Sequence, residues 1–552
     1  ALIDAGSGRS VSYGELKARA TAVAAGISEK DIKGVPVALT LPRGIEQIEA
    51  ALGILLSGNS YLSVSLSQPK DRRALIHEKT GVRYVVTNRE LSEKLDWPEG
   101  TEILVMEGME EGQENVRLPE VSPKDSAYII MTSGSTGVPK GVEIAHESAW
   151  NTVQDINEKY HVTSADRALA VSAMDFDLSV YDVFGILGAG GTLVLLPEQE
   201  RRNADYWLEQ VLKYQITVWN SVPVLLDMLL IRAESMKQKL PIRAVMLSGD
   251  WIGMDLPQRV AAWTEDCQFV AMGGATEASI WSNYQNVTLP MPKNWKSIPY
   301  GKPLRYQAYR VVDEYGRDCP YWAEGELWIG GFGVAKGYRG DSALTGQKFI
   351  TDQYGRWYRT GDLGRIWDDE TIEFLGRKDH QVKIRGHRIE LGEIEHAIQE
   401  FPGVAHAVVD TVSDGHGNKT LAAYIGAPIQ EDSKVTTYLY GTDIFGRGWK
   451  ELKDDVSNWQ MQQERKTAYK NFLAYADQRC VQLMLETLIE LGVFVSEKEV
   501  LSQKEIFEKG SITETQKNTV ARWLEILKKE GILREEDGRL SRTGKEVAVP
   551  EK

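Results

Sequence analysis

The sequence has little cysteine, no long apolar run and no excess of basic side chains. Its three cysteines, Cys267, Cys319 and Cys480, are too few and too scattered for a disulfide framework or a cysteine-based metal site. We therefore expect a reducing, cytoplasmic setting. No apolar run reaches the ~18 residues that a membrane span needs, and the opening residues lack the basic start and apolar core of a secretory signal. We expect no membrane partner.

Basic side chains are outnumbered, since 64 Lys and Arg against 79 Asp and Glu give a net charge of −15. Residues 435–552 are nearly neutral, with 19 basic and 20 acidic side chains, so almost all of the imbalance lies in residues 1–434. Neither part has the basic excess that binding to a phosphate backbone requires, and we expect no nucleic-acid partner.

The length of 552 residues predicts three or four domains, and a hydrophobic content of 42% is ample for large cores. The sequence opens without Met and stops without an obvious ending, so we expect a piece of a longer protein.

The sequence pattern of residues 1–420 is typical of an α/β protein. Short β-branched runs alternate with helical patterns and predict sheets flanked by helices. The predicted strands include 37–41, 84–87, 103–106 and 192–196, and the predicted helices include 45–57 and 205–214.

Near residue 430 the sequence pattern changes to a mainly helical one. Residues 449–494 and 513–530 are predicted to be helical, and Asp537-Gly538 predicts a hairpin turn.

The strongest chemical motif is a hydrophobic strand that starts at Tyr128 and runs into a loop of hydroxyl and glycine residues ending at Lys140. Such a loop can surround a polyphosphate with N–H groups and hydroxyls, while the lysine adds positive charge. It has neither the Walker spacing nor a dinucleotide fingerprint, and taken alone it could be a flexible turn. The candidate phosphate-binding residues are Thr132, Ser133, Gly134, Ser135, Thr136, Gly137 and Lys140.

With its companion motifs, this loop resembles that of adenylate-forming enzymes, specifically the adenylation domains of nonribosomal peptide synthetases. The companions follow in the family's order, at 274–277 (GATE), 325–330 (GELWIG), 358–362 (YRTGD) and 376–386 (GRKDHQVKIRG). The resemblance implies a large α/β core, followed by the start of a small α+β subdomain.

The resemblance also implies a two-step reaction. An amino acid carboxylate attacks the α-phosphate of ATP, and the acyl group then passes to the phosphopantetheine thiol of a peptidyl carrier domain. Glu277 matches the family's Mg²⁺ ligand, Asp362 the carboxylate that accepts the ribose hydroxyls, and Arg377 a ribose or phosphate contact. The other matched nucleotide-binding positions are Gly274, Ala275 and Thr276.

Three further positions follow from the resemblance. Gly273 stands where many family members carry an aromatic that stacks on adenine, so stacking must come from elsewhere or be weaker. Asp379 matches the hinge before the small subdomain, and Gly386 lies in the loop that faces the acceptor thiol after rotation.

The resemblance carries over to a substrate pocket in which Asp177 binds the α-ammonium group. The pocket residues together are very similar to the family's cysteine code, and their bulk and polarity fit a small thiol. Serine, threonine or alanine remain open on physical grounds, and Met246, Met272 and Ile280 could simply be core. The pocket residues are Asp177, Leu178, Tyr181, Asn220, Met246, Ser248, Met272, Ile280 and Trp281.

The family pattern breaks after residue 430, where the expected ending with its lysine loop is missing. We expect an adenylation core at 1–378, a partial small subdomain at 379–430 and an insert at 431–552. In yersiniabactin- and pyochelin-like siderophore synthetases such inserts resemble methyltransferases. A separate helical docking module is the alternative, and its near-zero charge argues against DNA binding.

Three functions stay open. The first is an adenylation enzyme for cysteine working beside neighbouring synthetase domains. The second is a fragment that binds ATP and amino acid but reacts slowly without the lysine. The third, disfavoured by Asp177, is an acyl-CoA or aryl-acid ligase.

Overall fold

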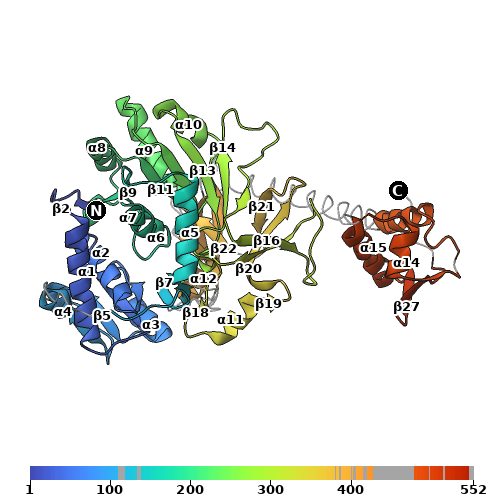
Figure 1. Ribbon diagram of the computed structural model, residues 1–552, viewed down its shortest axis with the longest axis horizontal. Helices are drawn as coiled ribbons and strands as arrows, with labels where there is room; N and C mark the ends of the chain where they lie inside the picture. The colour runs from blue at the N-terminus through green and yellow to red at the C-terminus, as the bar shows by residue number, and fades with distance from the viewer. Residues whose placement is uncertain are drawn as a thin grey trace, which may run out of the picture. The chain divides into compact units, whose positions relative to one another are not determined.

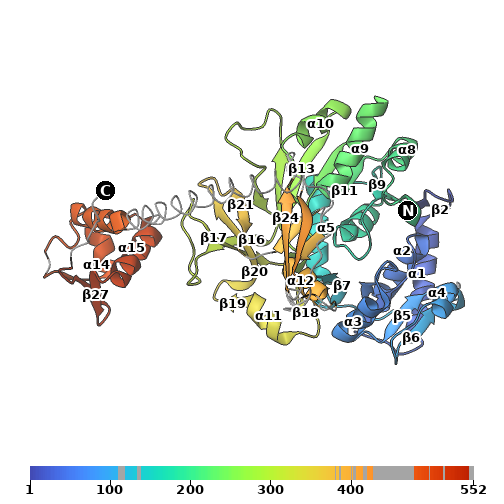
Figure 2. The same ribbon diagram turned by 180° about the vertical axis from the view of Figure 1, so that it is seen from behind.

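The structure is a computed structural model that describes residues 1–109, 118–133, 139–378, 381–384, 387–399, 401, 404, 406–413, 419–426, 478–496, 498–513 and 516–545. The chain divides into two compact units, Ala1–Pro428 and Ile429–Lys552. The predicted boundary at residue 378 falls inside the first unit and stays a prediction. Figures 1 and 2 show the elements from opposite sides.

The largest sheet described in the first unit is a nine-stranded mixed sheet. Its central strands are parallel, as expected for strands that alternate with helices along the chain. The strands in spatial order are β15 (Lys302–Pro303), β14 (Asn283–Val287), β13 (Gln268–Gly273), β12 (Ala244–Leu247), β11 (Val218–Ser221), β9 (Arg167–Ala170), β10 (Thr192–Leu195), β1 (Leu2–Asp4) and β2 (Ser10–Val11).

A seven-stranded sheet is the second sheet of this unit. Its strands β7 and β8 are antiparallel neighbours, and the hydroxyl- and glycine-rich loop connects them. The spatial order is β18 (Gly337–Tyr338), β8 (Lys140–Ala145), β7 (Ser126–Thr132), β4 (Ser60–Ser63), β3 (Pro36–Leu39), β5 (Tyr84–Thr87) and β6 (Glu102–Val105).

Helices flank both sheets, and most begin at a recognisable signal. Helix α1 has a complete capping box formed by Ser12 and Glu15, and α9 opens on Pro223. The helices are α1 (Tyr13–Ser28), α2 (Ile45–Leu56), α3 (Lys70–Thr80), α4 (Arg89–Lys94), α5 (His146–Lys159), α6 (Leu178–Val180), a π-helical turn (Tyr181–Gly185), α7 (Ile186–Gly188), α8 (Ala204–Tyr214), α9 (Pro223–Met236), α10 (Leu256–Trp263) and α11 (Ser342–Lys348).

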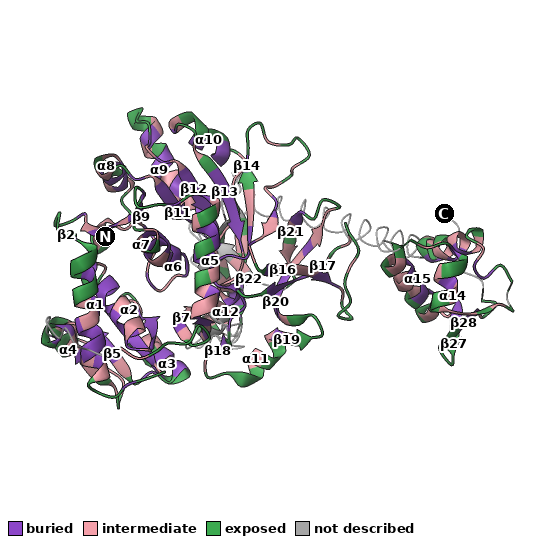
Figure 3. Ribbon diagram, in the orientation of Figure 1, coloured by how far each residue is buried: buried purple, intermediate pink, exposed green. Residues whose placement is uncertain are grey.

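Successive side chains along the strands of the nine-stranded sheet point to opposite faces, and each face packs into a different hydrophobic core. Trp219, Val245 and Leu247 belong to a cluster with α8, α9 and α10, whereas Val218 and Met246 belong to the largest cluster. The larger cluster also contains residues of the seven-stranded sheet, so the two sheets share this core. Figure 3 shows these strands as buried and the outer helix faces as exposed.

A five-stranded antiparallel sheet follows, and then two hairpins with a helix. The sheet contains β16 (Gln307–Val312), β17 (Gly325–Gly331), β20 (Gly355–Ile366), β19 (Phe349–Asp352) and β21 (Ile372–Arg377), of which β21 pairs with β20. The last part of the unit contains β22 (Gln381–Ile384), β23 (His387–Glu390), α12 (Leu391–Gln399), β24 (His406–Ser413) and β25 (Lys419–Gly426).

The predicted mixed α/β architecture is confirmed, with shifts of one to four residues at the ends of elements. The strand predicted at 37–41 is observed as β3, and the helix predicted at 45–57 as α2. Helix α15 (Lys517–Lys529) starts later than the predicted 513. The helix predicted at 449–494 is described only from 478, and there it ends at residue 490.

The described part of the second unit has a core of its own. Helical residues 478–490, α14 (Gln503–Lys509) and α15 surround Leu488, Phe494 and Leu527, all fully buried. A three-stranded sheet contains β26 (Val500–Ser502), β28 (Arg539–Arg542) and β27 (Leu533–Glu536). The predicted hairpin turn is confirmed, because Asp537 and Gly538 both have positive φ between β27 and β28. Within the described residues, no helix is both long and apolar enough to span a bilayer.

Candidate functional site

Several predicted pocket residues lie at the carboxyl ends of the parallel strands β11, β12 and β13. Asn220 is paired in register with Met246 on the neighbouring strand, and Met272 lies near the end of β13. Side chains two apart along a strand share a face, so these residues point toward the same side as Val218 and Val270. In open α/β sheets, the carboxyl ends of strands are where ligands bind.

A short helical segment covers this sheet face and brings Leu178 and Tyr181 to the strand ends. Asn220 Nδ2 donates to the Leu178 carbonyl oxygen at 3.1 Å and to Asp182 Oδ1 at 2.8 Å. The segment changes from α6 to a π-helical turn at Tyr181, a local irregularity often found at functional sites.

Two aromatic rings form one side of the predicted pocket. The rings of Tyr181 and Trp281 lie 5.1 Å apart between centroids, tilted by 54°. Tyr181 directs its hydroxyl to Asn157 Oδ1 at 3.0 Å, whereas Trp281 Nε1 donates to Ser248 Oγ at 2.8 Å. All nine predicted pocket residues are buried, and the apolar ones belong to the largest hydrophobic cluster.

Asp177 links this group to the 274–277 motif. Its side chain is 6% exposed, and Thr276 Oγ1 donates to its Oδ2 at 2.6 Å. A buried carboxylate is costly unless it is hydrogen-bonded or paired with a cation, so this position suits a positively charged ligand group.

Glu277, Tyr338 and Lys140 lie together on the phosphate-loop side. The Tyr338 hydroxyl donates to Oε1 of the fully buried Glu277 at 2.8 Å, and Lys140 Nζ lies 5.8 Å from the centre of the Tyr338 ring. Strand β18, which carries Tyr338, pairs with β8, which begins at Lys140. The end of the loop and the carboxylate of the 274–277 motif are thereby neighbours.

Asp362 and Arg377 form a third group on the five-stranded sheet. They are paired in register on β20 and β21, and Arg377 Nη1 lies 2.6 Å from Asp362 Oδ1. The same nitrogen donates to the Thr360 carbonyl oxygen at 2.8 Å. Since the Asp362 side chain is only 9% exposed, this contact holds the carboxylate in a defined orientation.

The two glycines before Ala275 are tightly enclosed. At Gly273 a Cβ atom would lie 2.7 Å from Asn283 Oδ1, and at Gly274 it would lie 2.8 Å from the Ser282 backbone nitrogen. Gly274 also has a φ of +148°, which a side chain disfavours. An aromatic at Gly273, as many family members have, would collide with the side chains of Asn283 and Tyr300 where they lie here.

Part of the predicted site lies outside the described residues. These are Gly134, Ser135, Thr136 and Gly137 of the loop, together with Asp379 and Gly386. Thr132 ends β7, and its Oγ1 lies 3.5 Å from the Lys140 carbonyl oxygen, a marginal hydrogen bond. Ser133 is the last described residue before the gap.

Three residues that sequence reasoning did not select lie in these groups. Asp182 directly follows the predicted pocket residue Tyr181, and Tyr338 follows the 325–330 motif by eight residues, but only the folded structure shows that they contact Asn220 and Glu277. Tyr300 lies beside Gly273, with its Cε1 atom 3.2 Å from where a Cβ would be. No pattern in the sequence distinguishes these residues from core aromatics and surface acids.

The donor groups suit Mg²⁺ that arrives with a nucleotide. Within the described residues, no group of three or more His, Cys, Asp or Glu side chains could hold a metal ion. Magnesium is usually bound through one or two carboxylates plus substrate phosphates and waters. The carboxylate of Glu277, near Lys140, fits that arrangement.

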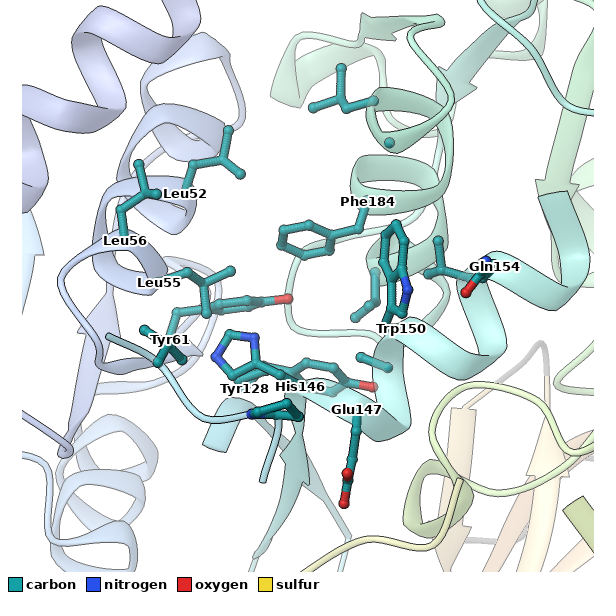
Figure 4. A pocket seen from close by; sticks show the side chains of 18 of the residues that line it. Leu52, Leu55, Leu56, Tyr61, Tyr128, His146, Glu147, Trp150, Gln154 and Phe184 are labelled. Carbon is teal, nitrogen blue, oxygen red and sulfur yellow. The ribbon is translucent and has the colours of Figure 1, made fainter. Parts of the chain in front are cut away.

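A large apolar cavity of about 1020 Å³ lies elsewhere in the first unit and contains none of the predicted site residues. Figure 4 shows Leu52, Leu55 and Leu56 on one side of it and Trp150 and Phe184 on the other. The helical segment that carries Leu178 and Tyr181 lines this cavity with other residues, such as Phe184. The cavity and the predicted substrate pocket are therefore distinct sites.

The chain resembles known proteins along most of its length. A family model described as AMP-binding enzyme matches residues 1–339. The anguibactin system regulator of Vibrio anguillarum is 48% identical over 448 residues, which cover 79% of this chain and 42% of that protein. Pyochelin synthetase PchE of Pseudomonas aeruginosa is 47% identical over 411 residues, covering 73% and 28%.

Solved structures show the same fold. The nonribosomal peptide synthetase FmoA3, in a form bound to α-methyl-L-serine-AMP, matches with a TM-score of 0.65 and 37% identity, covering 76% of this chain and 47% of that one. The chain spans less than half the length of each of these relatives.

Proposed function

The chain belongs to the AMP-binding enzyme family of adenylate-forming enzymes, and from that membership we propose that it activates L-cysteine with ATP for nonribosomal peptide synthesis. The products are cysteinyl-adenylate and pyrophosphate. The acyl group then passes to the phosphopantetheine thiol of a carrier domain. The likeness to pyochelin synthetase and to the anguibactin regulator supports a place in a siderophore assembly line.

The observation that carries this proposal is the buried carboxylate of Asp177. It accepts a hydrogen bond from Thr276, beside Glu277, and lies next to the pocket residue Leu178. A substrate α-ammonium group would place a positive charge beside this buried carboxylate, whereas an aryl or fatty acid carries no cation that could bind there. This favours an amino acid over the substrates of acyl-CoA and aryl-acid ligases.

The remaining groups fit the first chemical step. In that step a substrate carboxylate oxygen forms a bond to the α-phosphorus, and the bond from that phosphorus to pyrophosphate breaks. We assign phosphate contacts to the loop between β7 and β8 and to Lys140, and ribose contacts to Asp362 and Arg377. Glu277 would hold Mg²⁺, which neutralises phosphate charge. Fixing these groups in advance lowers the barrier by orientation and electrostatics.

Cysteine is favoured by the shape and polarity of the pocket. Tyr181 and Trp281 shorten it, and Asn220 and Ser248 add polar atoms to otherwise apolar walls. Serine is the main competitor, since FmoA3 was solved with a serine derivative and exchanging a hydroxyl for a thiol changes little in shape.

Amino-acid-dependent exchange of labelled pyrophosphate into ATP tests the proposal. We expect L-cysteine to give the highest kcat/KM in a panel of twenty amino acids, and Asp177→Asn to lower it by about 10²-fold or more through loss of the ammonium partner. Serine or threonine giving faster exchange than cysteine would overturn the substrate assignment. Exchange driven by an aryl acid instead would overturn the whole proposal.

A further inference from the structure

Two buried polar atoms beside the pocket have no hydrogen-bond partner among the described residues. They are Asn220 Oδ1 and Asp182 Oδ2, whose side chains are 2% and 1% exposed. An unsatisfied buried acceptor loses the hydrogen bonds that it makes to water in the unfolded chain, so native proteins keep few of them, and each calls for an explanation.

The amide group of Asn220 is fixed in one orientation. Both of its N–H groups are committed, one to the Leu178 carbonyl oxygen and one to Asp182 Oδ1. The amide therefore cannot exchange its oxygen and nitrogen positions without losing two hydrogen bonds. The oxygen is left as a bare acceptor on the sheet face that also carries Met246.

Asp182 differs from Asn220, because a small cavity beside it could hold a water molecule that hydrogen-bonds to Oδ2. A cavity of about 20 Å³ is lined by Asp182, Arg43 and Ser179 but not by Asn220, and it has the size that holds one water molecule. Burial raises the pKa of Asp182 to about 8, so at neutral pH its carboxyl group is mainly protonated and can donate to such a water. This cavity is not lined by Asn220, so a water in it does not account for Asn220 Oδ1.

We propose that Asp182 is a positioning residue that holds the Asn220 amide so that its oxygen accepts a hydrogen bond from the S–H or O–H group of the substrate side chain. The inference rests on the proposed function and adds to it how the site discriminates between amino acids. The site then prefers amino acids with a donor at the γ position over shape-matched apolar ones, because only a donor satisfies the buried oxygen.

The test compares L-cysteine with L-2-aminobutyrate, which has a methyl group in place of the thiol. The measured quantity is the ratio of their kcat/KM values in pyrophosphate exchange. We expect Asn220→Ala to lower this ratio by about tenfold. Asp182→Ala is expected to lower it several-fold, and Asp182→Asn, whose amide oxygen can still accept from Asn220, is expected to keep it within about twofold.

Two controls separate positioning from general damage. Gln210→Ala removes another buried amide with a free oxygen, on α8 away from the pocket, and should leave the ratio unchanged. In the double variant, Asp182→Ala should lower the ratio no further once Asn220 is Ala, because Asp182 acts through Asn220. Asp182→Leu, which avoids a cavity, replaces Asp182→Ala if the latter does not fold.

The two proposals fail in different ways. If no amino acid drives exchange in the unaltered protein, the proposed function is wrong. If L-cysteine drives exchange but Asn220→Ala leaves the ratio unchanged, the acceptor role is wrong. Equal and additive losses from Asp182→Ala with and without Asn220 would overturn the positioning role while leaving the proposed function intact.

Discussion

At the scale of single residues, Asp182 makes folding depend on pH in an unusual direction. A carboxylate that is paired with a cation or hydrogen-bonded in the folded state usually has a lowered pKa. Burial instead raises the pKa of Asp182 to about 8 from 3.8, and the hydrogen bond from Asn220 and the charge of nearby Arg43 offset this only in part. Below pH 4 the group is protonated whether the chain is folded or not. Between pH 4 and 8 only the unfolded chain loses the proton, so the folded state becomes less favourable as pH rises.

We therefore expect Asp182→Asn to stabilise the first unit increasingly as pH rises from 5 to 8. The expected slope relative to the unaltered protein is about 1.4 kcal/mol per pH unit, because one proton is bound in the folded state and not in the unfolded one. Denaturant unfolding at several pH values measures it. Gln210→Ala serves as a control, since it removes a buried amide on α8 and no titrating group, so its effect on stability should be the same at every pH. Parallel curves for Asp182→Asn would contradict the raised pKa.

At the scale of elements, the β13–β14 pair explains how the chain can lack the usual aromatic at Gly273. Asn283 on β14 is paired in register with Gly273 and fills the space above it. Tyr300 follows β14 and lies beside the same glycine, stacked on Phe374 of β21 with centroids 5.2 Å apart and planes at 14°. Burial and the negative charge of nearby Asp362 raise the pKa of Tyr300, so this ring lies close to the ribose-binding candidate.

We expect Tyr300 to supply the aromatic surface for adenine that Gly273 cannot. Tyr300→Ala should raise the KM for ATP by about tenfold, since base–aromatic stacking is worth about 1–3 kcal/mol, while the KM for the amino acid changes little. Tyr300→Phe keeps the ring and should behave like the unaltered enzyme. Equal effects of the two substitutions, or a change in the amino acid KM alone, would show that the ring does not face the nucleotide.

Sequence periodicity predicts helices and strands but misses contacts between distant residues, and the reason is physical. Alternating and 3.6-residue patterns predicted α2, α8 and β5 within one residue at either end, because one buried face sets both pattern and element. The hydrogen bond from Tyr338 to Glu277 joins positions 61 apart in the chain and leaves no local pattern. The left-handed backbone at Ser279 and Ile280, just before the predicted pocket residue Trp281, also leaves no signal in the sequence, since β-branched residues normally avoid that conformation.

At the scale of the whole molecule, the two units have separate hydrophobic cores. Each cluster among the described residues lies entirely within residues 2–372 or within 481–540, and none contains members of both units. The near-neutral charge of residues 435–552 also sets them apart from the acidic remainder. Separate cores favour separate unfolding transitions, because cooperativity depends on shared packing.

Substituting one core leucine in the second unit tests this independence. Leu488 is fully buried in the helical residues 478–490, and Leu488→Ala should cost about 2–5 kcal/mol and lower the melting temperature of the second unit by about 10 °C or more. The transition of the first unit and its pyrophosphate exchange should stay unchanged. Leu483→Ala, at a position 45% exposed in the same helix, is the matched control and should change either transition by little. If calorimetry finds that Leu488→Ala moves both transitions together, the two units do not unfold independently, and the second unit contributes to the stability of the first.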